Sequence, residues 1–174
     1  FVSIEGQHYR LFPFIDGSHT LEVAAQPTQA WEAARQFGRF TRMLDGFDAS
    51  RLQLTLPDFH NLPLRYDQFK QALRKGNPER INSTRDESAF LQSQYVIAGE
   101  WLQRMHQFSV RVTHHDTKIS NVLFDENGKG LCVIDLDTVM PGYFISDVGD
   151  MMRTYLSPVS EEEADTDKII IRRE

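Results

Sequence analysis

The stretch THHDTKISNVLFD, residues 113–125, decides how the rest of this chain is interpreted. It places a dense set of polar side chains between two apolar runs, 110–112 and 122–124. Asp116 can orient an alcohol or accept its proton, and Asn121 offers a neutral oxygen ligand that suits Mg²⁺. Lys118 lies between them and can neutralise charge on a phosphate. These are the groups that a protein contributes to phosphoryl transfer.

A second acidic run, Val-Ile-Asp-Leu-Asp at 133–137, follows the first. Asp135 ends an apolar run that predicts a strand over 131–136. A buried carboxylate without a partner is costly, so a metal ion is a fitting partner for it. The adjacent His114, His115 and Asp116 leave a metal-dependent hydrolase open as another interpretation. Neighbouring side chains on an extended segment point to opposite sides, which makes this a poor shared metal site.

The spacing His114-x-Asp116-x-x-x-x-Asn121, with Asp135 downstream, resembles the aminoglycoside/choline-kinase-like branch of the protein-kinase-like fold. The resemblance implies that Asp116 is the catalytic base and that Asn121 and Asp135 hold Mg²⁺. It also implies that His114 structures the loop, that Lys118 supports catalysis, and that ATP is the phosphate donor.

The same resemblance predicts an α+β chain that is mostly the helical large lobe, with the small lobe largely absent. Residues 1–17 resemble the last small-lobe strands and the hinge, and 18–174 resemble a large lobe truncated at its end. Adenine would bond backbone groups from Pro13 to Ile15, beside Phe12, Phe14 and Leu123. The chain contains no glycine-rich phosphate loop. We therefore expect this chain alone to be weakly active or inactive.

Within this branch, residues 112–118 and 134–142 look most like bacterial N-acetylhexosamine 1-kinases, and 57–61 add to that impression. The implied acceptor is the anomeric hydroxyl of N-acetylglucosamine or N-acetylgalactosamine. Asp137, Asp150 and Arg153 are candidates to face the sugar, although each is also interpretable as a surface charge, and Asp150 and Arg153 have the spacing of a helical ion pair. Asp147 is predicted to bind backbone N–H groups of the loop. His115 is interpreted as a filler at the loop surface.

Other functions fit the same residues. Choline, homoserine, methylthioribose and aminoglycoside kinases share the chemistry and differ in the acceptor, a sugar or an amino alcohol. A non-catalytic pseudokinase module that binds a nucleotide or a partner is the alternative from another class. The retention of Asp116, Asn121 and Asp135 argues against it.

The amino-acid composition of the chain limits the kinds of partner that it can bind. The 174 residues carry 25 acidic and 19 basic side chains, a net charge of −6, which argues against a nucleic-acid-binding surface. Nucleotide binding stays open because a metal ion offsets phosphate charge. Cys132 is the only cysteine, so a reducing cytoplasm is expected, and no apolar run is long enough to cross a membrane. The sequence leaves the oligomeric state open.

The hydrophobic pattern also predicts the elements around the polar stretch. A hairpin is expected over residues 1–15, turning at Gly6 and Gln7, with further strands at 110–112 and 121–124. Helices are expected at 27–45, 66–73, 85–107 and 147–156. Thr84 and Glu87 have the spacing of a capping box. The acidic run 161–165 is interpreted as a solvated face or a helix start.

Overall fold

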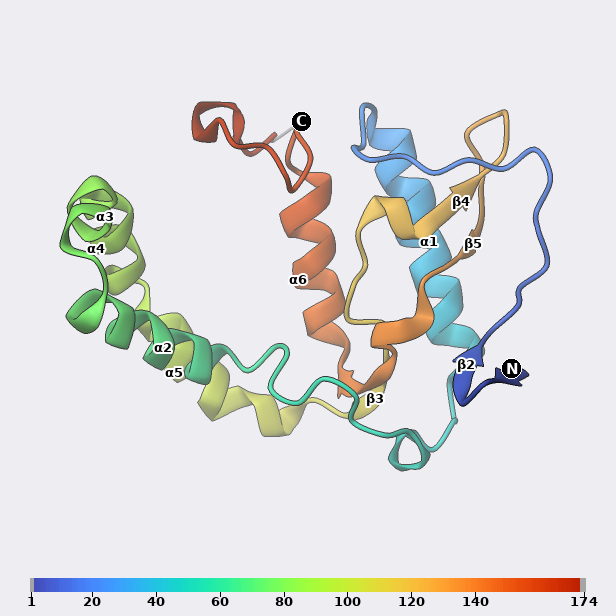
Figure 1. The fold of residues 1–174 in the computed structure, drawn as a ribbon, viewed down its shortest axis with the longest axis horizontal. Helices are drawn as coiled ribbons and strands as arrows, with labels where there is room; N and C mark the ends of the chain where they lie inside the picture. Colours follow the sequence, from blue (N-terminus) through green and yellow to red (C-terminus); the bar gives the residue numbers. More distant parts are fainter. Residues whose placement is uncertain (1, 173–174) are drawn as a thin grey trace. The chain divides into compact units, whose positions relative to one another are not determined.

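The computed structural model describes residues 2–172 (Figure 1). The chain divides into two compact units. The first unit contains the chain up to Phe40, Lys118–Asp135, and the residues from Met151 onward. The second contains Thr41–Thr117 and Leu136–Asp150. Helix and strand are mixed, as predicted. The lobe boundary predicted at residue 17 stays a prediction, and Phe1, predicted to begin the first strand, lies outside the described residues.

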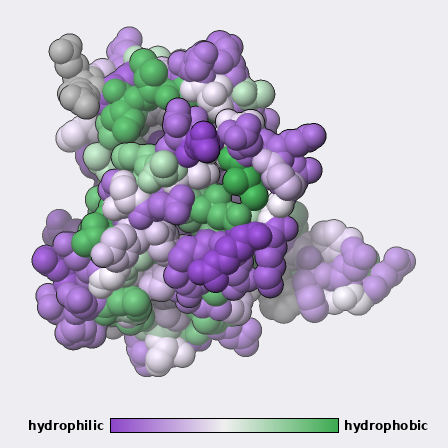
Figure 2. Space-filling view, turned by 90° about the vertical axis from the view of Figure 1, so that its left-hand side faces the viewer, coloured by the Kyte–Doolittle hydropathy of each residue, from purple (hydrophilic) through white to green (hydrophobic). Residues whose placement is uncertain are grey.

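The first unit begins with an antiparallel hairpin of β1 (Val2–Ile4) and β2 (Gln7–Tyr9). Its turn residues, Glu5 and Gly6, both have positive φ, 52° and 79°, as a type I′ turn requires. The predicted second strand was too long: β2 ends at Tyr9, residues 10–15 lie outside it, and Pro13 has no N–H to donate to a ladder. Large side chains in this segment are exposed, Phe14 to 88%. Figure 2 shows hydrophobic residues, in green, among the polar ones at the surface.

The core of the first unit forms where α1 (Pro27–Met43) meets β4 (Val122–Phe124) and β5 (Gly130–Val133). Ala33 and Phe37 lie four residues apart, so they share one face of the helix, and both are buried with Phe124. The prediction of this helix is confirmed. Its last residue is Met43, two before the predicted one, and Gly46 follows with φ of 79°.

Two side chains of α1 also form hydrogen bonds with the backbone of β5. Gln36 Nε2 donates to the carbonyl of Gly130 at 2.5 Å, and the Gly130 N–H donates to Glu32 Oε2 at 2.9 Å. A Cβ on Gly130 would lie 2.8 Å from Gln36 Cγ, so the close approach needs glycine. In the turn joining β4 to β5, Gly128 has φ of 75°.

The second unit contains β3 (Val110–Thr113), which pairs antiparallel with β6 (Met140–Tyr143). Helix α6 (Phe144–Tyr155) begins directly after β6, three residues before the predicted start. The strand predicted over 131–136 ends early, because Asp135 has φ of 58° and leaves the extended conformation. The remaining helices of this unit are α2 (Leu62–Lys75), α3 (Pro78–Ser83), α4 (Arg85–Ser93) and α5 (Tyr95–Arg104).

The helical region differs from its prediction in four places. Helix α2 begins at Leu62, four residues before the predicted start, and its first turn contains Pro63. The single helix predicted over 85–107 breaks at Gln94 into α4 and α5. Thr84 does not cap α4, because its Oγ1 donates back to the Arg80 carbonyl at 3.0 Å. Asn77 caps α3, accepting from the N–H groups of Glu79 and Arg80, and α3 lies in a stretch for which no helix was predicted. Single 3-10 turns lie at Ala49–Arg51, Met105–Gln107, Ile119–Asn121, Leu136–Thr138 and Thr166–Lys168.

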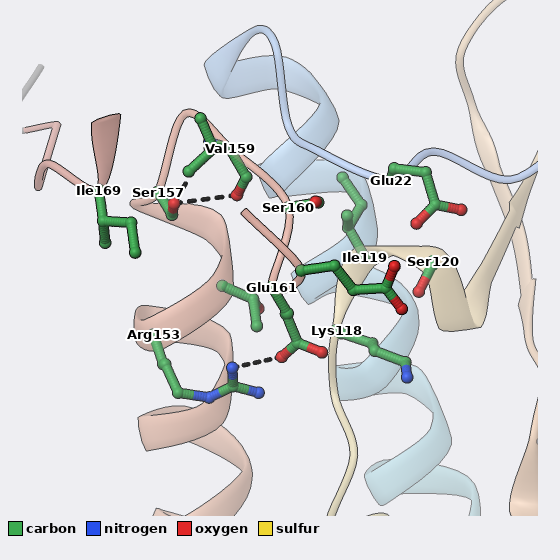
Figure 3. Close-up of a pocket in the computed structure, with 12 residues that line it drawn as sticks. Glu22, Lys118, Ile119, Ser120, Arg153, Ser157, Val159, Ser160, Glu161 and Ile169 are labelled. Carbon is green, nitrogen blue, oxygen red and sulfur yellow. Dashed lines mark hydrogen bonds and ion pairs between the residues drawn. The ribbon is translucent and has the colours of Figure 1, made fainter. Parts of the chain in front are cut away.

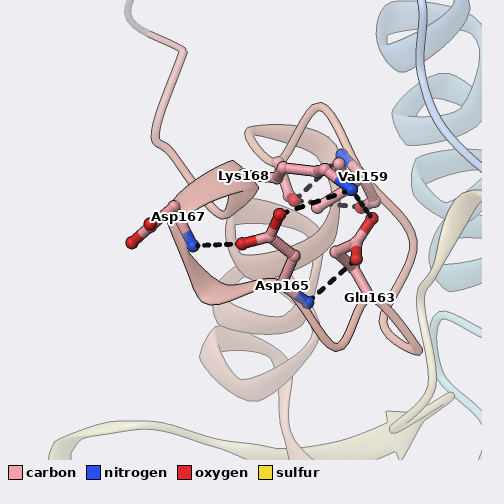
Figure 4. Close-up of polar contacts among 6 residues, drawn as sticks. Val159, Glu163, Asp165, Asp167 and Lys168 are labelled. Carbon is pink, nitrogen blue, oxygen red and sulfur yellow. Dashed lines mark hydrogen bonds and ion pairs between the residues drawn. The ribbon is translucent and has the colours of Figure 1, made fainter.

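The acidic run near the C-terminus begins one of these turns. Asp165 accepts from the Asp167 N–H at 3.2 Å, and Lys168 Nζ lies 3.5 Å from carboxylate oxygens of both Glu163 and Asp165 (Figure 4). Asp165 thus caps a single 3-10 turn, and most of the acidic run is exposed, as the solvated-face interpretation expects. No helix in the described part of the chain is long and apolar enough to cross a membrane.

Candidate active site

Asp147 holds the backbone of the polar loop, which we define as residues 113–121. Its Oδ2 accepts from the His114 N–H at 3.0 Å and its Oδ1 from the His115 N–H at 2.8 Å. Both histidines and Asp147 are buried. Burial raises the pKa of the Asp147 carboxyl, while the two N–H groups act in the opposite direction. The predicted role of Asp147 as a partner of loop N–H groups is confirmed.

Asp150 binds the loop just beyond Asp116. Its Oδ2 accepts from the Thr117 N–H at 2.6 Å and from Thr117 Oγ1 at 3.2 Å. Thr117 Oγ1 also donates to the Asp147 carbonyl at 2.8 Å, and Asp150 is only 8% exposed. The first turns of α6 therefore supply two carboxylates that fix the loop on both sides of Asp116.

Two further hydrogen bonds hold this segment. Thr138 Oγ1 donates to the His114 carbonyl at 2.6 Å. The Asp116 N–H donates to His114 Nδ1 at 3.3 Å. His114 thus folds its ring back onto the loop, which is the contact expected of the residue predicted to structure it.

The interpretation of His115 as a surface filler was wrong. Its side chain is 5% exposed, and its backbone has φ of 70°, which a side chain with a Cβ adopts at a cost. The ring lies against β6, where a Cβ on Gly142 would overlap it. On its other side the ring of His60 stacks at 5.2 Å and 20°. Among the described residues, neither ring nitrogen of His115 has a hydrogen-bond partner.

This enclosure changes the protonation of His115. Burial lowers the pKa of the ring to about 4, and the neighbouring His60 adds to the effect. The charged form is disfavoured because the ring has lost water without gaining a carboxylate. His115 is therefore neutral near pH 7.

The predicted metal ligands lie in the first unit, just outside the paired strands: Asn121 directly precedes β4, and Asp135 lies two residues after β5. The Ile134 N–H donates to the Asn121 carbonyl at 2.9 Å, which continues the pairing of Val122 with Val133. Asp135 follows directly, in the left-handed conformation. The pairing brings the backbones of Asn121 and Asp135 close together, although they are 14 residues apart in sequence.

The chemistry of this pair fits magnesium. Mg²⁺ takes oxygen ligands, keeps several waters, and is bound by one or two protein groups together with substrate phosphates. Asn121 and Asp135 supply oxygen ligands only. Across residues 2–172 no three His, Cys, Asp or Glu side chains gather in a way that would hold a metal ion.

The residues predicted to contact adenine belong to the same unit as this pair. His19 and Phe124 exchange two backbone hydrogen bonds, 3.0 and 2.8 Å long. They tie the segment after the expected hinge to β4, which carries Leu123. Phe12 and Phe14 are 69% and 88% exposed, so apolar surface is available beside Pro13 and Ile15.

A cavity of about 680 Å³ in the first unit joins two of the predicted site residues, Lys118 and Arg153. Arg153 forms an ion pair with Glu161, and Lys118 stands across from this pair (Figure 3). Glu22 and Ser120 also line the cavity. Sequence reasoning missed Glu22 and Glu161, because no motif marks them.

The candidate residues thus fall into two sets. Asn121, Asp135, Lys118, Arg153 and the adenine-contact residues belong to the first unit. His114, Asp116, Asp150 and an exposed Asp137 belong to the second. The polar loop runs from one set to the other, and Asp116 is only five residues from Asn121.

An aspartate on a loop held by two carboxylates, and an asparagine and an aspartate beside a hairpin, are the residue types expected of an enzyme that transfers phosphoryl groups. A family model described as the phosphotransferase enzyme family, APH, matches residues 2–168. The chain belongs to this family, whose members are aminoglycoside- and choline-kinase-like enzymes acting on small molecules. The family has a protein-kinase-like fold and generally uses ATP and Mg²⁺.

Proposed function

We propose that this protein transfers a phosphoryl group from Mg-ATP to a hydroxyl of a small molecule, with the anomeric hydroxyl of N-acetylglucosamine or N-acetylgalactosamine as the preferred acceptor. The observation that carries the proposal is the bracing of Asp116. Asp147 holds the two residues before it and Asp150 holds the residue after it. A loop fixed in this way keeps a catalytic carboxylate in place without help from the substrate.

In this proposal each residue has one task. Asp116 orients the acceptor hydroxyl and accepts its proton. Asn121 and Asp135 hold Mg²⁺, and Lys118 offsets charge on the transferring phosphate. Bound Mg²⁺ supplies charge neutralisation between the phosphates. The backbone of Pro13 to Ile15, with Phe12, Phe14 and Leu123 beside it, receives adenine.

The cavity lined by Lys118 and Arg153 supports a polar acceptor. Its volume of about 680 Å³ lies in the range of small-molecule sites. Arg153 and Lys118 donate hydrogen bonds, and Glu22 and Glu161 accept them, a mixture that suits a molecule with many hydroxyl groups. Asp137 remains a candidate sugar contact. The contacts of Asp150 favour a bracing role over a sugar contact.

The experiment is an ADP-release assay on a panel of acceptors, comparing wild type with Asp116→Asn. We expect turnover with N-acetylhexosamines and a loss of roughly 100-fold or more in kcat for the variant, because it lacks the base. Asp86→Asn, an exposed carboxylate in the first turn of α4, is the matched control and should keep wild-type turnover.

Each part of the proposal can fail separately. Turnover with an amino alcohol or an aminoglycoside, and none with N-acetylhexosamines, would overturn the acceptor assignment and leave the kinase chemistry intact. An Asp116→Asn protein that matches wild type in every assay would instead favour a pseudokinase module.

A further inference from the structure

One partner of the polar loop comes from a distant segment. His60 Nε2 lies 3.0 Å from the carbonyl oxygen of His115, 55 residues later in the chain. A carbonyl oxygen can only accept a hydrogen bond, so Nε2 of His60 carries the proton and donates it. The other side chains described above as binding the loop backbone, Asp147, Asp150, Thr138 and His114, lie in the loop or within 33 residues of it.

The contact falls on the peptide group that joins His115 to Asp116. Its carbonyl accepts from His60 at 3.0 Å, and its N–H donates to His114 Nδ1 at 3.3 Å. The peptide plane is therefore held from both sides. Because a peptide group is planar, holding its two ends fixes the direction in which the Asp116 Cα departs, and with it the carboxylate.

The ring of His60 is itself held in place. It stacks on the His115 ring at 5.2 Å, and the Phe59 ring lies 4.6 Å from it. The next residue, Asn61, caps α2 by accepting from the Leu64 N–H at 3.1 Å, and it donates to Asp58 Oδ1 at 2.7 Å. His60 is thus fixed at the start of a helix that is remote in sequence from the loop.

We propose that His60 is a positioning residue for Asp116: by holding the His115–Asp116 peptide plane, it sets the orientation of the catalytic carboxylate. This proposal rests on the assignment of Asp116 as the base. His60 touches neither substrate nor cofactor in it. Its effect belongs to kcat and not to nucleotide binding.

The test compares His60→Phe with His60→Gln in the complete protein. Phenylalanine keeps a ring for the stack and removes the donor, whereas the glutamine Nε2 restores a donor at a similar reach. We expect His60→Phe to lose roughly 10- to 100-fold in kcat, because a misplaced base loses part of its contribution, with an unchanged KM for ATP. His60→Gln should recover most of the rate.

Hydrogen exchange gives a readout that does not depend on activity. Amides of residues 114–117 should exchange faster in His60→Phe than in wild type, and His60→Gln should restore their protection. His106→Phe, an exposed histidine of the same unit, is the matched control and should change neither rate nor exchange.

Two results would overturn the proposal: wild-type kcat in His60→Phe, or a slow His60→Phe whose loop exchanges as slowly as wild type. An inactive wild type would overturn the proposed function instead. The exchange of residues 114–117 would then still show whether His60 holds the loop.

Discussion

At the scale of single residues, the site depends on a backbone conformation that its side chain does not favour. His115 has φ of 70°, and a non-glycine residue in such a region costs on the order of 1 kcal/mol or more. The conformation persists because both ends of the residue are bound, the N–H by Asp147 and the carbonyl by His60. The strained residue lies inside the polar loop, directly before Asp116.

The pKa of His115 predicts a pH dependence of stability. Unfolded His115 takes up a proton near its ordinary pKa of 6.5, whereas the folded residue stays neutral down to about 4. Between these values the unfolded state binds more protons, so stability is lost as the pH falls through this window. From pH 7.5 to 5 the loss for this group is roughly 2 kcal/mol.

The measurement is urea unfolding of wild type and His115→Asn at both pH values. Asparagine tolerates positive φ and does not titrate, so the stability advantage of wild type should shrink by roughly 2 kcal/mol at the lower pH. His106→Asn is the control, because this exposed side chain keeps its water on folding. An advantage that stays constant from pH 7.5 to 5 would contradict the prediction.

The sequence predicts the roles of single residues where the family resemblance covers them. Asp147 was predicted as a partner of the loop in this way, and its contacts with two loop N–H groups confirm it. His115 was misjudged because residues 59–60 and 140–142 bury it. Nothing in the local pattern around residue 115 marks these neighbours. The same distance in sequence hid the contact of His60.

At the scale of elements, β6 must approach the polar loop closely. Gly142 lies opposite Arg111 in the β3–β6 pair, and a Cβ there would overlap the His115 ring and lie 3.3 Å from Thr113 Cβ. We expect Gly142→Ala to lower the free energy of unfolding by about 1–3 kcal/mol, the usual cost of overpacking. Activity should fall with it, because the ring of His115 must move.

The control for this substitution is Gly149→Ala in α6. A Cβ at Gly149 meets nothing within 4 Å, and alanine is favoured over glycine in a helix by about 1 kcal/mol. We therefore expect the change in the free energy of unfolding, measured by chemical denaturation, to have opposite signs in the two variants. A Gly142→Ala protein as stable as wild type would show that β6 has room to move from the loop.

Element types were predictable from the sequence, and their ends were not. Helix α1 has a clear apolar face, and its prediction is confirmed within two residues at the C-terminal end. No glycine or proline lies at Gln94, where the predicted helix breaks, so the sequence gives no signal for the break. Thr84 fits a capping box by spacing, yet its hydroxyl has a competing acceptor in the carbonyl of Arg80. Whether a side chain caps a helix depends on which acceptor is nearest to it, and the spacing of residues in the sequence does not specify this.

At the scale of the whole molecule, the candidate residues are divided between the two units. Asp116, which we propose as the base, belongs to the second unit with Asp147 and Asp150, and the proposed metal ligands and adenine-contact residues belong to the first. Asp116 and Asn121 both lie in the polar loop, five residues apart in sequence. The family motif was readable because its residues are concentrated in this loop, whereas the division into units depends on packing between distant segments.

This division predicts that nucleotide binding and catalysis can be separated by mutation. A ligand that binds only the folded state stabilises it, by about 2.7 kcal/mol at 100 times its Kd. We expect Mg-ATP to raise the Tm of wild type and of Asp116→Asn alike, because the base is not needed for binding. Asp135→Asn should lose the magnesium-dependent part of the shift, because it lacks a charged ligand for the ion.

The variant at Asp135 is a clean one, since asparagine also tolerates the φ of 58° found there. Thermal unfolding with ATP alone, with Mg²⁺ alone and with both separates the contributions of nucleotide and metal. Asp125→Asn is unsuitable as a control because Asp125 Oδ1 accepts from the N–H groups of Asn127 and Lys129. Asp86→Asn serves as the control instead, because Asp86 is far in sequence from the candidate site residues. An equal magnesium-dependent shift in wild type and Asp135→Asn would remove Asp135 from the metal site, and the ligand would have to be sought among other carboxylates.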